Sequence, residues 1–138
     1  MSWLDHLALP GPGRRAVDEL YSTPPSLAGA DLHEVVVSRD SPSVALRFNL
    51  AEFADRPRQE WVAAGMNRVQ VRLRFDFVED LVIRGFGFTN DVSIDMDLVD
   101  DEKLAVHVHG PTTDITFRCW REPMLSKISA YIHNPNSI

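Results

Sequence analysis

The feature that most constrains the fold is a two-residue alternation of apolar and polar side chains, which recurs through most of the chain. The clearest stretch spans residues 69–77, where valine, leucine and phenylalanine alternate with arginine, glutamine and aspartate. Successive side chains of a β-strand point to opposite faces, so this stretch predicts a strand with one face on a core and one in solvent. Several such stretches in one chain predict a sheet.

About eight strands are expected, at residues 32–38, 43–50, 69–77, 81–86, 92–98, 104–109, 115–119 and 125–132. Arg39-Asp-Ser-Pro42 has the composition of a turn, which predicts a hairpin between the first two strands. Glu79 and Asp80 are expected to form the turn between the third and the fourth. Connections this short favour antiparallel pairing throughout.

Helical spacing is confined mainly to the N-terminus, where residues 3–7 and 14–21 predict one or two short helices. Ser22-Thr-Pro-Pro25 ends the second, because proline lacks an amide hydrogen and restricts the residue before it. One further helical turn is expected near Glu60 to Ala64. The fold class is therefore α+β, mostly antiparallel sheet, with either an open twisted sheet or a flattened barrel.

Length and composition predict a single globular domain over residues 1–138, with 44% hydrophobic and 25% charged residues. No apolar run approaches the roughly 20 residues of a membrane-spanning helix, and no secretory signal is visible. A lone cysteine, Cys119, excludes an internal disulfide, so we expect a cytoplasmic protein. Its neighbours Phe117 and Trp120 suggest an inert, partly buried thiol.

The formal net charge of −6 disfavours nucleic acid as a partner and favours a basic protein. Four arginines on polar strand faces could form an anion-binding patch or a solvated face balanced by neighbouring acids; they are Arg47, Arg68, Arg72 and Arg74. No aromatic residue alternates with them to stack bases, so we favour the balanced face.

Two histidines two residues apart, His107 and His109, are the best candidates for metal ligands. Both would share one face of a strand, and a three-residue loop at residues 100–102 would place Asp95 opposite His107 and Ser93 opposite His109. Two imidazoles and a carboxylate can bind zinc or Fe(II). A cross-strand Asp–His pair is also ordinary sheet stabilisation. A metal-dependent enzyme or small-ligand-binding β-domain therefore remains an alternative hypothesis.

Other catalytic arrangements find no support in the sequence. A serine nucleophile would need a Gly-x-Ser-x-Gly elbow, which is missing. Gly85-Phe-Gly-Phe lacks the lysine of a phosphate-binding loop. We therefore expect no enzyme and no cofactor.

Acidic residues surround one predicted hairpin and suggest a surface that steers toward a basic partner. The candidate contacts are Asp95, Asp97, Asp100, Asp101 and Glu102, with Asp91 nearby. The alternative is a hairpin whose charges serve only solubility. Trp3, Trp61 and Trp120 could be core residues or interface anchors.

Apolar and turn-forming residues give the chain a resemblance to a known family along nearly its whole length. The shared pieces are Trp3-Leu4, Tyr21-x-x-x-Pro25-x-Leu27, Leu32-His-Glu-Val35, Arg39-Asp-x-Pro42, Val44-x-Leu46-x-Phe48-x-Leu50, Trp61, Asn67-x-Val69-x-Val71-x-Leu73, Leu81-x-Ile83-x-Gly85 and Ile128-Ser-Ala-Tyr131. In their order and spacing the chain resembles the bacterial immunity protein fifty family of polymorphic toxin systems.

The resemblance implies an α+β cytoplasmic protein that binds and neutralises a cognate toxin and is not an enzyme. It transfers no contact residues, because the shared positions are those that folding explains. Occlusion of the toxin's active surface is the expected mechanism. The toxin's identity, the binding surface, the oligomeric state and the strand order are not determined by the sequence.

Overall fold

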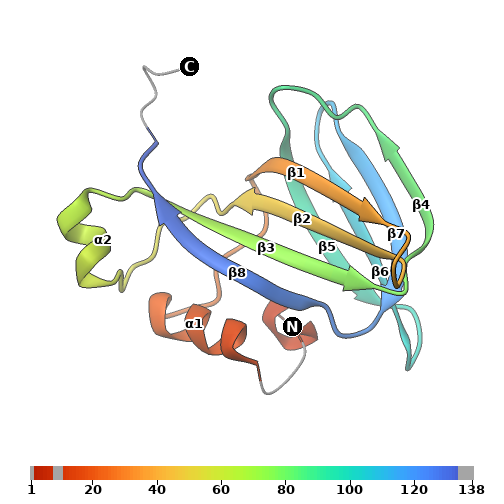
Figure 1. Cartoon of the computed structure of the whole chain (residues 1–138), viewed down its shortest axis with the longest axis horizontal. Coiled ribbons are helices and arrows are strands. Elements are labelled where there is room, and N and C mark those ends of the chain that lie inside the picture. The colour runs from red at the N-terminus through yellow and green to blue at the C-terminus, as the bar shows by residue number, and fades with distance from the viewer. Residues whose placement is uncertain (1, 8–10, 134–138) are drawn as a thin grey trace.

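The computed structural model describes residues 2–7 and 11–133 (Figure 1). Its helices are the 3-10 helix η1 (Trp3–His6), α1 (Pro12–Leu20) and α2 (Gln59–Ala64). Its strands are β1 (Ala30–Ser38), β2 (Ser43–Asn49), β3 (Arg68–Asp76), β4 (Glu79–Arg84), β5 (Asp91–Leu98), β6 (Lys103–His109), β7 (Asp114–Trp120) and β8 (Met124–Tyr131). None of the described helices is both long and apolar enough to cross a bilayer.

The strands form one antiparallel sheet in the order β4-β7-β6-β5-β1-β2-β3-β8. β1 and β5 join its halves through only two residue pairs, Ala30 with Val92 and Asp31 with Asp91. Beyond them the sheet divides into a first half-sheet (β1, β2, β3, β8) and a second half-sheet (β5, β6, β7, β4), arranged around a common core (Figure 1). The sheet is open, because its end strands β4 and β8 do not pair.

Inward-facing side chains of the two half-sheets meet in a single core. The largest fully buried ones on the strands are Leu32, Val44, Leu46, Phe48, Val69, Leu73, Phe75, Leu104 and Ile115. Phe75 and Phe117 join the half-sheets, with ring centroids 5.1 Å apart and ring planes at 72°. This edge-to-face geometry is one that aromatic pairs prefer. The alternation is confirmed as the division between core and surface in β3, β6 and β7. It is wrong at Phe77 and Leu98, which are exposed, and β4 is largely exposed on both faces.

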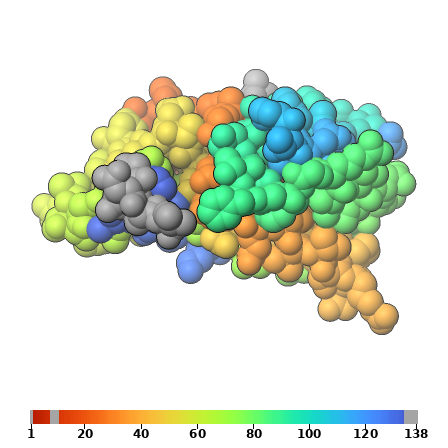
Figure 2. All heavy atoms as spheres, turned by 90° about the horizontal axis from the view of Figure 1, so that it is seen from above, coloured from red at the N-terminus to blue at the C-terminus, as the bar shows by residue number. Residues whose placement is uncertain are grey.

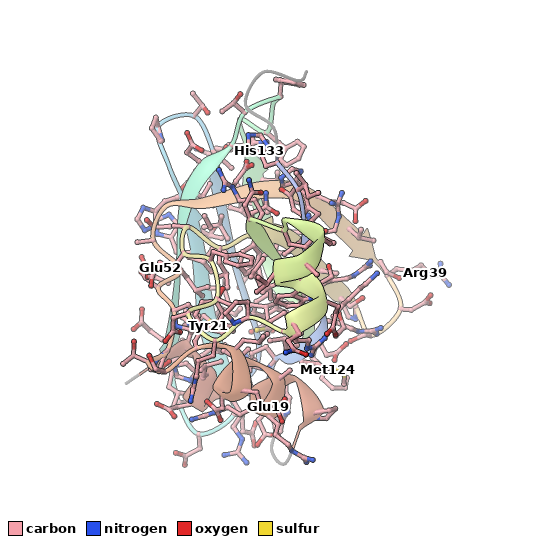
Figure 3. The ribbon with its side chains drawn as sticks, turned by 90° about the vertical axis from the view of Figure 1, so that its left-hand side faces the viewer. Glu19, Tyr21, Arg39, Glu52, Met124 and His133 are labelled. Carbon is pink, nitrogen blue, oxygen red and sulfur yellow. The ribbon has the colours of Figure 1, made fainter. Side chains whose placement is uncertain are left out.

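Both α-helices lie on one side of the molecule, in front of the strands in Figure 3. α1 packs along β8, and a Cβ at Gly13 would lie only 2.7 Å from the Cβ of Leu125, so glycine permits this close approach. The position of η1 is fixed by a hydrogen bond in which the Trp3 indole N–H donates to the carbonyl oxygen of Pro25 at 2.8 Å. The helices thereby place Leu4, Val17 and Leu20 in the core.

Two local expectations are confirmed and one is wrong. β1 and β2 form the predicted hairpin, and α2 is the predicted helical turn. Glu79 and Asp80, however, lie within β4 instead of forming a turn. The chain leaves the first half-sheet at Phe77, whose positive φ of 54° redirects the backbone. β4 therefore pairs with β7 in the second half-sheet, not with β3.

Replacing Phe75 by alanine is expected to lower the free energy of unfolding by about 3–5 kcal/mol, because a large buried side chain is removed. Phe75 is 0% exposed and Phe88 is 96% exposed, so Phe88→Ala is a matched control. We expect the control to change stability by less than about 0.5 kcal/mol. Urea unfolding followed by circular dichroism measures both, and equal losses would contradict the assignment of the core.

Candidate functional site

The acidic residues predicted as a partner surface lie on β5 and on the turn that leads to β6. All are exposed: Asp95, Asp97, Asp100, Asp101 and Glu102. Their contacts divide them into carboxylates that stabilise the fold and carboxylates that face solvent. That division decides which of them a partner could use.

Asp95 belongs to a cluster with the two histidines of β6. The register sets Asp95 opposite His107 and Ser93 opposite His109, as predicted. The side chains pair diagonally: His109 Nε2 lies 2.6 Å from Asp95 Oδ2, and His107 Nε2 lies 2.6 Å from Asp114 Oδ1.

The two imidazole rings of this cluster are neighbours on one face, with centroids 4.7 Å apart. The two rings pair with different carboxylates. His107 Nε2 is directed at Asp114, and His109 Nε2 is directed at Asp95. Within residues 2–7 and 11–133, no three His, Cys, Asp or Glu side chains are grouped so that they could hold a metal ion. The arrangement fits two cross-strand pairs that stabilise the second half-sheet.

Asp100 organises the turn between β5 and β6. Its Oδ1 accepts the backbone N–H groups of Glu102 and Lys103, both at 2.8 Å. These two hydrogen bonds hold the pKa of the Asp100 carboxyl below its ordinary value. Lys103 in turn forms an ion pair with Glu79, in which Nζ donates to Oε1 at 2.6 Å. This hydrogen bond raises the pKa of the Lys103 ammonium group. Asp100 is therefore a structural residue of the turn.

Asp97, Asp101 and Glu102 differ from these residues, because their carboxylates take part in no hydrogen bond or ion pair among the described side chains. Exposed apolar side chains lie beside them, namely Leu98, Val99 and Trp120. We call these six residues the acidic end. A shallow pocket of about 190 Å³, lined in part by Glu102, Trp120 and the exposed Phe77, borders it. The acidic end combines free negative charge with an apolar centre.

A cleft of about 870 Å³ lies where the two half-sheets join. Five separate segments line it, with Gly29, Asp31, Leu32, His33, Asn49, Leu50, Ala51, Arg68, Gly87, Phe88, Thr89, Asn90, Asp91 and His133. No local motif marks such a set, so the sequence did not predict it. The cleft is at the Asp91 end of β5 and the acidic end is at the Leu98 end, so the two are separate.

A chain of hydrogen bonds stiffens one wall of this cleft. Arg47 Nη1 donates to Gln70 Oε1 at 3.3 Å, and Gln70 Nε2 donates to Asn49 Oδ1 at 3.1 Å. These bonds orient the Asn49 amide nitrogen toward Tyr131 and toward His33 Nε2, the latter at 2.9 Å. Asn49 is only 4% exposed, and its partners explain why a polar side chain is tolerated there.

The outer face of the first half-sheet carries the predicted arginines, Arg47, Arg68, Arg72 and Arg74. Two of them have acidic partners: Arg47 lies 3.5 Å from Glu34 and Arg74 lies 3.0 Å from Asp76. Lys127 lies opposite Arg72 on the neighbouring strand. This partly balanced, cationic face is less suited to a basic partner than the acidic end is.

Cys119 is buried beside the carbonyl of Leu104, with Sγ 3.8 Å from that oxygen. Burial raises the pKa of the thiol to about 12. At neutral pH the group is therefore protonated and a poor nucleophile. This agrees with the inert thiol expected from its apolar neighbours.

A family model described as Immunity protein 50 matches residues 13–125. The chain belongs to this family. Comparisons with curated proteins and with solved structures find no match. Membership in the Immunity protein 50 family implies an immunity protein of a toxin system, with a toxin as its binding partner. The family resemblance stated from the sequence is thereby confirmed.

The region matched by the Immunity protein 50 model extends from α1 to the first residues of β8. It includes the whole second half-sheet and the acidic end. A toxin can contact only the exterior of an Immunity protein 50 fold, so the surfaces described above are the candidates for its binding site. The acidic end has both exposed charge and exposed apolar area, and the cleft has the exposed Asp91 and Phe88 in its lining.

Asp100→Ala is expected to lower the free energy of unfolding of this Immunity protein 50 member at neutral pH, and to lower it by less at acidic pH. Because the folded-state pKa of Asp100 lies below the ordinary 3.8, its stabilisation is present above that value and is lost as the pH falls through the lowered folded-state pKa. The unfolding free energies of wild type and variant, measured between about pH 6 and pH 2, are expected to converge as the pH approaches about 2.

Asp101→Ala is the matched control for this measurement, because it removes a carboxylate from the same turn without removing either hydrogen bond. An equal, pH-dependent loss in both variants would show that the loss does not come from the two hydrogen bonds that Asp100 accepts.

Proposed function

We propose that this immunity protein neutralises its cognate toxin by docking the acidic end onto a basic active surface of the toxin and occluding it. The observation that carries the proposal is the grouping of free carboxylates, from Asp97, Asp101 and Glu102, around exposed apolar side chains. In protein interfaces a desolvated apolar centre supplies much of the affinity, and surrounding charges supply orientation and specificity.

Electrostatic steering supports the first step of this mechanism. The chain carries a net charge of −6, and the acidic end concentrates part of it on one projecting turn. A field of this kind accelerates encounter with a basic partner and orients it. Trp120 is then placed to act as an anchor, because tryptophan is enriched among interface residues that dominate affinity.

The rigidity of the turn between β5 and β6 supports the second step of this mechanism, the occlusion of the toxin. The turn is braced by Asp100, by the Lys103–Glu79 ion pair and by a hydrogen bond from the Arg121 N–H to the Glu102 carbonyl oxygen at 3.0 Å. A surface ordered before binding loses little conformational entropy in the complex. Steric cover of the toxin's active surface then needs no chemical step by the immunity protein.

We further propose that the toxin is a bacterial polymorphic toxin and that neutralisation takes place in the cytoplasm, without enzymatic activity of this chain. A single cysteine suits a reducing compartment. Occlusion accounts for protection by binding alone.

The test is a binding experiment with the toxin encoded by the neighbouring gene. Wild type is expected to form a 1:1 complex that abolishes toxicity, and Asp97→Lys/Asp101→Lys is expected to raise the dissociation constant by about tenfold to a hundredfold, mainly through slower association at low salt. The matched control Glu19→Lys/Glu60→Lys makes the same change of charge on exposed positions of α1 and α2 and is expected to bind like wild type.

Unchanged affinity in the Asp97→Lys/Asp101→Lys variant would exclude the acidic end as the contact surface. Metal analysis of the purified protein tests the alternative separately. About one equivalent of zinc or iron, lost in a His107→Ala/His109→Ala variant, would instead support the metal-dependent hypothesis.

A further inference from the structure

A nearly fully exposed aromatic side chain lies at the cleft where the two half-sheets join. Phe88 is 96% exposed and belongs to the lining of this cleft. Its loop, drawn in green after β4, lies on the surface of the molecule beside the orange residues of β1 (Figure 2). Single exposed apolar residues are common on protein surfaces, so the significance of Phe88 depends on what holds its loop and on what lies beside it.

A buried amide holds the loop that carries Phe88. Asn90 is 1% exposed, and its side-chain oxygen and nitrogen each make two hydrogen bonds. Oδ1 accepts the Gly87 N–H at 2.8 Å and the Thr113 hydroxyl at 3.1 Å. Nδ2 donates to the carbonyl oxygens of Gly87 at 2.7 Å and of Leu32 at 3.3 Å. The loop is thereby tied to β1 and to the residue before β7, and it presents the phenyl ring from a backbone that is ordered before any partner binds.

The size and the buried part of the cleft suit a side chain that enters from a partner. Its volume of about 870 Å³ lies within the range of roughly 300–1,000 Å³ that is usual for binding sites. Leu32 and Leu50, each 2% exposed, are the apolar part of its inner lining. A projecting group can therefore make apolar contact inside the cleft and contact Phe88 where the cleft opens.

Two carboxylates oppose each other where β1 meets β5, in the lining of the same cleft. Asp31 and Asp91 form one of the two residue pairs that join the half-sheets. Like charges directly opposite each other across a ladder destabilise it. His33 Nε2 lies 3.1 Å from Asp31 Oδ2, whereas the exposed Asp91 carboxylate takes part in no hydrogen bond or ion pair among the described side chains. The junction thus contains a repulsion that a cation would relieve.

An organic cation fits this position better than a metal ion does. Within residues 2–7 and 11–133, no three His, Cys, Asp or Glu side chains are grouped so that they could hold a metal. A guanidinium group donates to carboxylates in a planar fork and also stacks on aromatic rings. Arg68, which lines the cleft from β3, does not supply this group, because its Nη1 donates to the carbonyl oxygen of Asn67 at 3.0 Å.

We propose that this cleft is a second contact site for the toxin and takes an arginine side chain from a projecting toxin segment, with the guanidinium between Asp31 and Asp91 and against the ring of Phe88. The inference rests on the proposed function, in which the toxin presents a basic active surface. Asp91 and Asp97 lie on the same face of β5, six residues and therefore about 20 Å apart. A standard interface buries about 800 Å² on each partner, which is large enough to include both sites.

The first experiment measures toxin binding and stability for the same variants. Asp91→Asn and Phe88→Ala are each expected to raise the dissociation constant of the toxin complex by about tenfold. Asp91→Asn is also expected to unfold at a higher urea concentration than wild type, because the like-charge pair is removed. A residue with only a structural role would not lose binding while stability rises. Glu19→Gln removes the same charge from an exposed position of α1 and, as the matched control, is expected to bind like wild type.

The second experiment needs no toxin and uses N-acetyl-L-arginine amide as the probe. In nuclear magnetic resonance spectra of the isotopically labelled full chain, the backbone amide signals of Phe88 and Asp91 are expected to shift as the probe is added. N-acetyl-L-citrulline amide has nearly the same shape without the charge and is expected to leave these signals in place. Asp91→Asn is expected to lose the response to the arginine probe.

The outcomes separate this inference from the proposed function. Unchanged toxin affinity in Asp91→Asn and Phe88→Ala, with reduced affinity in Asp97→Lys/Asp101→Lys, would overturn the cleft and keep the acidic end as the contact surface. The reverse result would support the cleft and exclude the acidic end. Equal responses to the arginine and citrulline probes, or an Asp91→Asn variant less stable than wild type, would overturn the cationic occupant.

Discussion

The rest of the structure depends on the packing of two half-sheets through one shared layer of apolar side chains. Only two residue pairs join β1 to β5, so ladder hydrogen bonds alone cannot hold the halves face to face. The contact between Phe75 and Phe117, with the buried aliphatic residues around it, supplies that attraction. Because alternate residues of each strand are committed to this layer, the polar residues between them must face outward, and the surface pattern follows from the core.

The outward residues do not all have the same role. Asp95 pairs with His109, and Asp100 accepts two backbone hydrogen bonds in the turn, so both carboxylates stabilise the fold. Asp97 and Asp101 have no such partner within residues 2–7 and 11–133, and in the proposed mechanism they attract a basic surface. The proposed occlusion of the toxin would require a rigid surface and a few unpaired charged groups, and the hairpin of β5 and β6 is the part of the fold on which that proposal rests.

Much of the fold could be predicted because local patterns encode it. The alternation around Asp95 and His107 predicted their opposition across the β5–β6 ladder, and the turn chemistry before Pro42 predicted the first hairpin. The crossing at Phe77 could not be predicted, because phenylalanine has no preference for a positive φ. The large cleft was missed because its lining comes from segments far apart in the chain.

The sequence by itself determined most of the buried residues, where most strands lie and, through its resemblance, the family, but not the exposure of Phe77 and Leu98. Only the tertiary structure decided that β4 joins β7 and leaves an open edge, and which carboxylates remain free. The physical reason is that a period of two specifies the face on which a side chain lies but not the neighbour of the strand that carries it. A short turn predicts the partner of a strand in a hairpin, such as β1 with β2, but the partner of β4 is chosen by packing between residues distant in sequence, which no local pattern records.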